Sequence, residues 1–194
     1  MRINNTQGTN FQKRLVGLGA IKQEDISKGV KFFHLDELSD IADLKKARKS
    51  AHWYGNYYLN DVVAGNDYYI KNFSVFTMED ESKNVLGFSI LDKNDSCTIL
   101  DIIETAPRLS CYREKRAMKY IGETMMSFIA TLSGKKDVKV NVIAPRPKTK
   151  NFYFSQCGFS KNIFDGSATL KRRNFKKLIK ANEAHTGKKV ELIS

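Results

Sequence analysis

The chain has 194 residues, of which 41% are hydrophobic and 28% charged, and its formal net charge is +12 at pH 7. This size and composition predict one globular domain that buries roughly 70% of the surface exposed by the unfolded chain. No run approaches the ~20 apolar residues of a membrane span, and the first residues lack the apolar core of a secretion signal. We therefore expect a cytoplasmic protein with no membrane partner. The excess of positive charge predicts a surface that attracts anions, whether cofactor phosphates, nucleic acid or an acidic protein.

Cysteine and histidine usage argues against two kinds of site. The three cysteines are odd in number and lack the paired spacing of a zinc site, so we expect reduced thiols at Cys97, Cys111 and Cys157. The histidines stand singly, with no Ser-His-Asp or metal-ligand spacing, and are expected to be surface or core side chains at His34, His52 and His185. The sequence therefore predicts no metal.

The order of the apolar runs predicts an α/β (α+β) fold with a mixed sheet flanked by helices. After an N-terminal extension over residues 1–28, strands are expected over 30–35, 68–77, 85–92, 97–105, 138–144 and 168–175. Helices are expected after Asp36, over 113–132 and over 148–156. The strand–helix–strand unit over 97–144 predicts parallel neighbours with a right-handed crossover. The domain is expected to cover residues 1–175, followed by a basic C-terminal tail over 176–194.

Three segments in fixed order resemble the GNAT family of N-acetyltransferases. They are ILDIIETAP over residues 99–107, KYIGETMMSFI over 119–129 and FYFSQCGF over 152–159. The region of resemblance spans roughly residues 85–163. It implies a GNAT-like central sheet in which two parallel strands splay apart at the cofactor site. It also implies transfer of an acetyl group from acetyl-CoA (coenzyme A) to an amine.

In that family the helix after the splayed strand begins at a turn written Gln/Arg-x-x-Gly-x-Gly/Ala, whose backbone N–H groups hold the pyrophosphate of coenzyme A. The matching stretch is residues 117–122, in which only the last glycine is kept. A second register, over 113–118, keeps the leading arginine and no glycine. Phosphate is bound there by main-chain donors and the helix dipole, so the loss of side-chain identity is tolerated. The implied cofactor-binding residues are Arg116, Lys119, Tyr120, Ile121, Gly122 and Glu123.

The segment FYFSQCGF resembles the pattern Phe-Tyr-x-x-x-Gly-Phe of the last family helix, where the aromatic pair lies beside the acyl group and pantetheine. The resemblance implies cofactor contact for Phe152. For Tyr153 it implies a catalytic role, protonation of the departing thiolate. The alternative is that Phe152 packs in the core and Tyr153 borders it.

The end of the strand over 97–105 is the third part of the implied site. Pantetheine would pair there as an added strand, and Thr105 and Ala106 would bind it through their main chain. Glu104 is the candidate general base for the acceptor amine, with Asp101 in reserve on the opposite face by strand alternation. A structural role for Glu104, bonding loop N–H groups or Arg108, is equally open.

The acceptor is less determined by the sequence. Aromatic residues between positions 53 and 69 form either acceptor-pocket walls or the packing of a helix pair. The segment KRRNFKKLIK over 171–180 is either a solvated tail or an RNA contact. Three hypotheses remain: an acetyltransferase for an amine-bearing small molecule or protein, a toxin-like enzyme that acetylates aminoacyl-tRNA, and a non-catalytic nucleic-acid-binding relative. A homodimer is left open. For the enzyme we expect direct transfer in a ternary complex, with no cysteine nucleophile.

Overall fold

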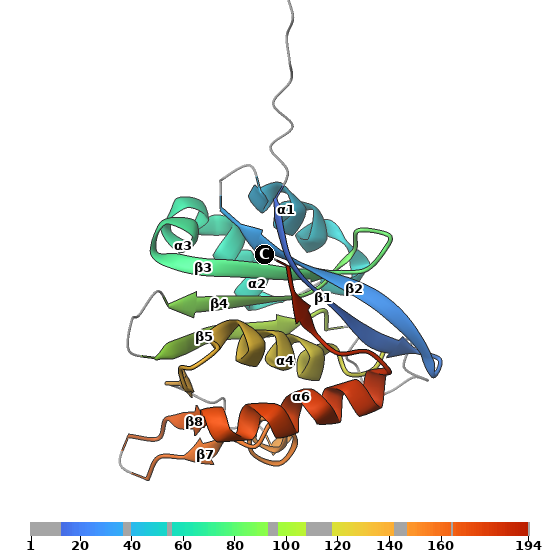
Figure 1. Ribbon diagram of the computed structural model, residues 1–194. Coiled ribbons are helices and arrows are strands. Elements are labelled where there is room, and N and C mark those ends of the chain that lie inside the picture. The colour runs from blue at the N-terminus through green and yellow to red at the C-terminus, as the bar shows by residue number, and fades with distance from the viewer. Residues whose placement is uncertain are drawn as a thin grey trace, which may run out of the picture.

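The computed structural model describes residues 13–36, 40–53, 56–92, 97–107, 118–141, 147–163 and 165–193. The strands in this part of the chain form one sheet, in the order β7-β8-β6-β5-β4-β3-β2-β1-β9 (Figure 1). They are β1 (Arg14–Gln23), β2 (Ile26–Leu35), β3 (Phe73–Glu79), β4 (Val85–Asp92), β5 (Thr98–Thr105), β6 (Val138–Val140), β7 (Ser160–Lys161), β8 (Ala168–Leu170) and β9 (Glu191–Leu192). The helices are α1 (Ile41–Lys49), η2 (Ala51–Trp53), α2 (Tyr57–Ala64), α3 (Asn66–Asn72), α4 (Ile121–Ser133), α5 (Pro147–Lys150), η3 (Asn151–Gln156) and α6 (Arg172–Thr186).

Helix α4 covers one face of the sheet and lies in front of it in Figure 1. The ring of Phe128, on this helix, stacks on Phe32 of β2 with centroids 4.1 Å apart and meets Phe76 of β3 edge-on at 5.4 Å. Its apolar positions recur at three- and four-residue spacing, so the packing follows directly from the sequence pattern. The predicted core role of this stripe agrees with the structure.

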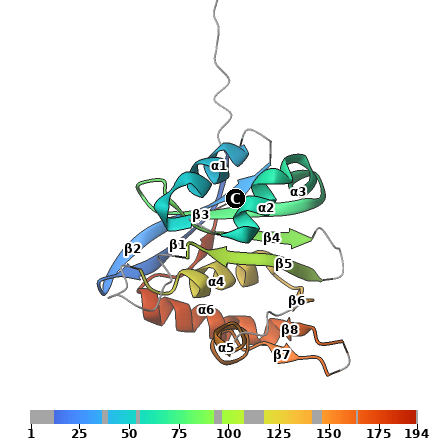
Figure 2. The same ribbon diagram turned by 180° about the vertical axis from the view of Figure 1, so that it is seen from behind.

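Helices α1, α2 and α3 lie on the other face, which is turned to the viewer in Figure 2. Trp53 anchors this layer, because its ring packs against Phe88 at 5.6 Å and its Nε1–H donates to the carbonyl of Val85 at 2.8 Å. The buried indole thus has both apolar contact and a hydrogen-bond partner. Trp53 is core packing here, as one of the two readings of this aromatic cluster predicted.

Two terminal segments contribute more to the sheet and its cover than the sequence suggested. Residues 14–23, expected to lie in an extension, form β1, which pairs antiparallel with both β2 and β9. Residues 172–186, expected to be partly strand and partly tail, form helix α6 against α4 (Figure 1). The strand predicted over residues 168–175 is β8, which ends at Leu170 because the following residues form a helix that buries Phe175, Leu178, Asn182 and Thr186 at helical spacing.

The strand predicted over residues 68–77 is wrong in its first half. Residues 66–72 form α3, and β3 begins at Phe73. Tyrosine has a high intrinsic preference for strands, and this preference led to the prediction. Here, however, the rings of Tyr68 and Tyr69 both pack near Phe73, at 5.8 and 5.9 Å, from one helical turn. Tertiary packing has overridden local preference.

Candidate active site

The first turn of α4 begins from an unusual backbone conformation. Tyr120 precedes the helix with φ of 66° and ψ of 15°, the left-handed region that glycine enters at least cost. In the matching family turn this is the position of the first glycine. The first hydrogen bond of the helix runs from the N–H of Thr124 to the carbonyl of Tyr120. The N–H groups of Ile121, Gly122 and Glu123 therefore precede the helical ladder and are the donors that an anion at this end would use.

Strand β1 holds this turn in place. The main chains of Lys22 and Lys119 bond to each other in both directions, at 2.7 and 3.3 Å. The ammonium of Lys119 also pairs with Asp25 at 2.9 Å, and this contact lowers the pKa of Asp25. Thr124, one turn into the helix, donates to the carbonyl of Ala20 at 2.8 Å. The predicted cofactor residues at the start of α4 are thus held by β1, whose residues were expected to lie in an extension.

Helix α6 reaches the same turn from the other side. His185 Nδ1 lies 2.8 Å from Glu123 Oε1, and the imidazole stacks on the ring of Tyr120 at 4.7 Å. Glu123 is 8% exposed. Sequence reasoning treated His185 as an unremarkable surface or core residue. Its partners lie 62 and 65 positions away along the chain, and no local motif joins them.

Strands β5 and β6 diverge beside this turn. Their parallel ladder pairs Thr98 with Val138 and Ile99 with Lys139, after which β6 ends at Val140 while β5 continues to Thr105. On its other side β5 stays paired with β4 up to Thr105. The geometry is the predicted splay of two parallel strands, and among the described residues nothing pairs with the β6 side of β5 beyond Ile99, where an added strand could bind.

The main-chain groups of Thr105 and Ala106, the two predicted binders at the end of β5, point to opposite sides of the strand. The N–H of Ala106 donates to the carbonyl of Leu86 on β4 at 2.8 Å, so this donor is already used. Because main-chain groups alternate in direction along an antiparallel strand, those of Thr105 point toward the β6 side. A register shift at Asp101 also breaks the alternation from which we placed it opposite Glu104.

Phe152 and Gly122 are brought into contact. A Cβ on residue 122 would lie 3.1 and 3.2 Å from two ring carbons of Phe152, closer than ordinary packing allows. The glycine therefore lets the ring sit directly on the first turn of α4. This contact joins the second and third predicted motifs.

Tyr153 lies in a π-helical turn, η3, in which the N–H of Cys157 donates to the carbonyl of Phe152 at 2.9 Å. Four residues separate Tyr153 from Gly158, one more than in the family pattern to which we matched this segment. A π turn closes on the fifth residue instead of the fourth, so it accommodates the extra residue without a break in the helix. Such turns are frequent at functional sites.

The side chain of Tyr153 is 7% exposed and packs edge-on against Phe152 and Phe159. Burial, with smaller effects from Cys157 and Glu104, raises the pKa of this phenol. Within the described ranges its hydroxyl has no hydrogen-bond partner. A nearly buried donor of this kind is available to a ligand.

Glu104 lies on the α2 side of β5, opposite Phe88 in the strand register. Asn56, the N-cap of α2, accepts from the N–H of Leu59 at 2.7 Å through its side-chain oxygen. That bond directs its Nδ2–H₂ group to the other side, where it lies 3.5 Å from Glu104 Oε2. Asn56 was not predicted as a site residue; its signal in the sequence is only that of a helix cap.

The remaining predicted residue, Arg116, lies outside the described residues. In the part of the chain that the structure describes, no group of three or more His, Cys, Asp or Glu side chains could hold a metal ion. None of the described helices is both long and apolar enough to cross a membrane.

The chain matches no protein-family model and no curated protein sequence, but its structure resembles solved ones. A protein from Desulfovibrio desulfuricans, described as an acetyltransferase of the GNAT family, matches with a TM-score of 0.51 at 13% identity, over 74% of this chain and 99% of that one. The structure of AtaTR bound with acetyl-CoA matches with a TM-score of 0.53 at 16% identity, over 77% of this chain and 97% of that one. A chimera of the spermidine N-acetyltransferase SpeG from Vibrio cholerae and hSSAT matches with a TM-score of 0.53 at 16% identity, over 76% of this chain and 98% of that one.

At these identities the likeness defines a fold. The chain has the fold of the GNAT acetyltransferases, with a mostly antiparallel sheet, one parallel pair and helices on both faces. The predicted fold class is confirmed.

Proposed function

We propose that this protein is an N-acetyltransferase that moves an acetyl group from acetyl-CoA to an amine. The observation that carries this proposal is the edge of β5 beyond Ile99, which no described residue pairs on the β6 side, next to the first three N–H groups of α4, which precede its hydrogen-bond ladder. An extended pantetheine chain can pair with the first, and a pyrophosphate can accept from the second. The pantetheine and the pyrophosphate of one ligand would thus bind two neighbouring stretches of main chain.

The proposed chemistry is direct transfer. The amine attacks the thioester carbonyl, a C–N bond forms and the C–S bond breaks. Glu104 receives the proton that the amine loses, directly or through a water, and Tyr153 gives its hydroxyl proton to the departing thiolate. The hydroxyl of Tyr153 is in the donor form at neutral pH, because the ordinary pKa of a tyrosine is 10.0 and burial raises it further.

Asn56 contributes to this arrangement as a positioning residue. Its oxygen is committed to the cap of α2, so its amide can only donate toward Glu104. A donor on that side orients the carboxylate of Glu104.

A covalent acyl-enzyme on Cys157 does not fit this site. The thiol is 2% exposed, and burial raises its pKa, so it stays protonated at neutral pH. The thiolate is the nucleophilic form of cysteine. Transfer within a ternary complex needs no such group.

Calorimetric titration with acetyl-CoA tests the cofactor site. Lys119 precedes α4 and Lys136 follows it, and the 13-residue helix between them spans about 20 Å. Lys119→Gln and Lys136→Gln each remove one positive charge. We expect Lys119→Gln to weaken acetyl-CoA binding several-fold and Lys136→Gln to leave it unchanged.

A wild-type protein that does not bind acetyl-CoA would refute the proposal. Equal weakening in both variants would assign the effect to net charge instead of to the turn. Gly122→Glu is less informative, because its side chain would also displace the ring of Phe152. Once binding is established, amines and aminoacyl-tRNA are the acceptors to screen for acetyl transfer.

A further inference from the structure

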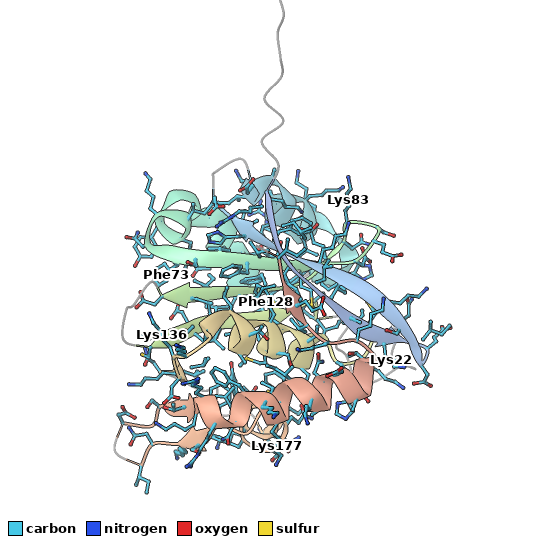
Figure 3. The ribbon with its side chains drawn as sticks, viewed as in Figure 1. Lys22, Phe73, Lys83, Phe128, Lys136 and Lys177 are labelled. Carbon is cyan, nitrogen blue, oxygen red and sulfur yellow. The ribbon has the colours of Figure 1, made fainter. Side chains whose placement is uncertain are left out.

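The solvent face of α6 carries a row of cations: Arg172, Arg173, Lys176, Lys177 and Lys180, all exposed. In the described part of the chain none of these five side chains forms an ion pair, whereas Lys119, Lys139 and Lys171 each have a carboxylate partner. The opposite side of the helix buries Phe175 and Leu178. Figure 3 shows Lys177 on α6, with α6 packed against α4.

This arrangement of charge destabilises the helix that carries it. Arg172 and Arg173 stand in the first turn, at the positive end of the helix dipole, and no acidic residue is present there. Residues 172 and 176, 173 and 177, and 176 and 180 are like-charge pairs four positions apart, which repel. Asp137 offsets part of this by accepting from the N–H of Arg172 at 2.7 Å. An anion bound along the outer face of α6 would reduce the remaining repulsion between its cations.

The face is suited to phosphates more than to a protein. None of the exposed large hydrophobic side chains of the described residues lies on α6. Protein interfaces rely on such anchors and are depleted in lysine. The five cations span about 12 Å of helix, which lies between the rise over four successive phosphates along one strand of a duplex, about 10 Å, and the rise over five, about 14 Å. We propose that the exposed face of α6 binds the sugar–phosphate backbone of a nucleic acid.

The position of α6 gives this surface a fixed relation to the candidate active site. Asn182, fully buried, donates to Thr124 Oγ1 of α4 at 2.9 Å, and Thr124 bonds onward to β1. His185, at the end of the helix, contacts Glu123 in the first turn of α4. The cationic row therefore runs toward the start of α4. The proposal does not depend on acyl transfer, because the charges act whether or not the protein is an enzyme.

Fluorescence anisotropy with a labelled RNA hairpin and a labelled DNA duplex of equal length tests the surface. If all five cations contact phosphates, raising salt from 50 to 200 mM weakens duplex binding roughly 500-fold and single-strand binding roughly 100-fold. The test variant changes Lys176, Lys177 and Lys180 to Gln. We expect it to reduce the slope of log affinity against log salt on duplex from about −4.5 to about −1.8.

Helix α1 offers a matched control. Lys45, Lys46 and Lys49 are exposed and have the same spacing as the three lysines of α6. Changing them to Gln lowers the net charge equally, and we expect affinity and salt slope close to those of the wild type. The α6 variant should also unfold at the same temperature or a higher one, because it loses like-charge repulsion.

Three results would overturn the proposal: equal loss of affinity in both variants, loss confined to the α1 variant, or polyglutamate binding as tight as that of RNA and DNA. The first would indicate net charge, the second another surface and the third an acidic protein partner. Selective loss in the α6 variant supports it, and the relative affinities for hairpin and duplex then identify the source of the phosphates.

Discussion

Tyr153→Phe separates catalysis from stability at the proposed acid. The substitution removes one hydroxyl and keeps the ring that packs against Phe152 and Phe159. If the hydroxyl protonates the departing thiolate, kcat falls tenfold or more, which corresponds to about 1.4 kcal/mol or more of transition-state stabilisation. Affinity for acetyl-CoA should change little, because the hydroxyl acts on the leaving group.

The same substitution should not destabilise the fold. The hydroxyl has no hydrogen-bond partner within the described residues, and the side chain is 7% exposed. The hydroxyl oxygen is not among the fully buried, unpaired polar atoms of the described residues, so it keeps contact with water. Its removal leaves no buried group unpaired, and we expect the melting temperature of the variant to stay within about 2 °C of the wild type.

Steady-state kinetics and differential scanning calorimetry, run on the same preparations, measure both effects. Tyr69→Phe is the control, because its hydroxyl donates to Asp61 at 3.1 Å on the surface between α2 and α3. We expect it to keep its kcat and to gain no stability. An unchanged kcat in Tyr153→Phe would refute the acid role. A melting temperature that falls by several degrees would show that the hydroxyl has a structural partner.

Three further predictions concern other groups. Asn56→Asp keeps the cap of α2 but sets a second carboxylate beside Glu104, so the acidic limb of the pH–rate profile should move to higher pH. Asn56→Ala removes the cap and should lower the free energy of unfolding, measured by urea denaturation, by about 1 kcal/mol. Burial raises the pKa values of Cys157 and Tyr153 above 9.0 and 10.0, their ordinary values. As pH rises, the folded state therefore keeps these two protons to a higher pH than the unfolded state does. Their contribution to the free energy of unfolding is complete below about pH 9 and is lost as pH rises through the raised pKa values. The urea-unfolding free energy should fall by about 1.4 kcal/mol per pH unit for each group above its ordinary pKa, and Cys157→Ala should reduce that slope. Asp137→Ala removes the acceptor of the first N–H of α6 and should lower the melting temperature by about 2–4 °C.

The part of the fold that carries the site was largely predictable. The stripe of α4 has strong three- and four-residue periodicity, and its packing on Phe32 and Phe76 follows from it. Strands β4 and β5 and the parallel neighbour β6 were also expected, and the structure has all three. Local pattern was enough here because each element is long or strongly apolar.

Local pattern failed where packing partners are distant or polar. The buried face of α6 includes Asn182 and Thr186, which a hydrophobic pattern does not reveal. In β1, a Cβ on Gly17 or Gly19 would press on Phe128 or Phe32, so these glycines serve close packing and carry no strand signal of their own. We consequently expected the β1 segment in an N-terminal extension, and the α6 segment partly in a strand and partly in the C-terminal tail.

The sequence by itself determined the class of fold and the places of the three motifs, because both depend on periodicity and on residues close together in the chain. Only the tertiary structure decided how the site is assembled. The left-handed turn at Tyr120, its contact with His185 and the π turn at Tyr153 depend on main-chain geometry and on neighbours from other elements. The pairing of Asn56 with Glu104 likewise joins residues 48 positions apart. Such contacts form only when distant segments pack together, and no spacing along the chain encodes them.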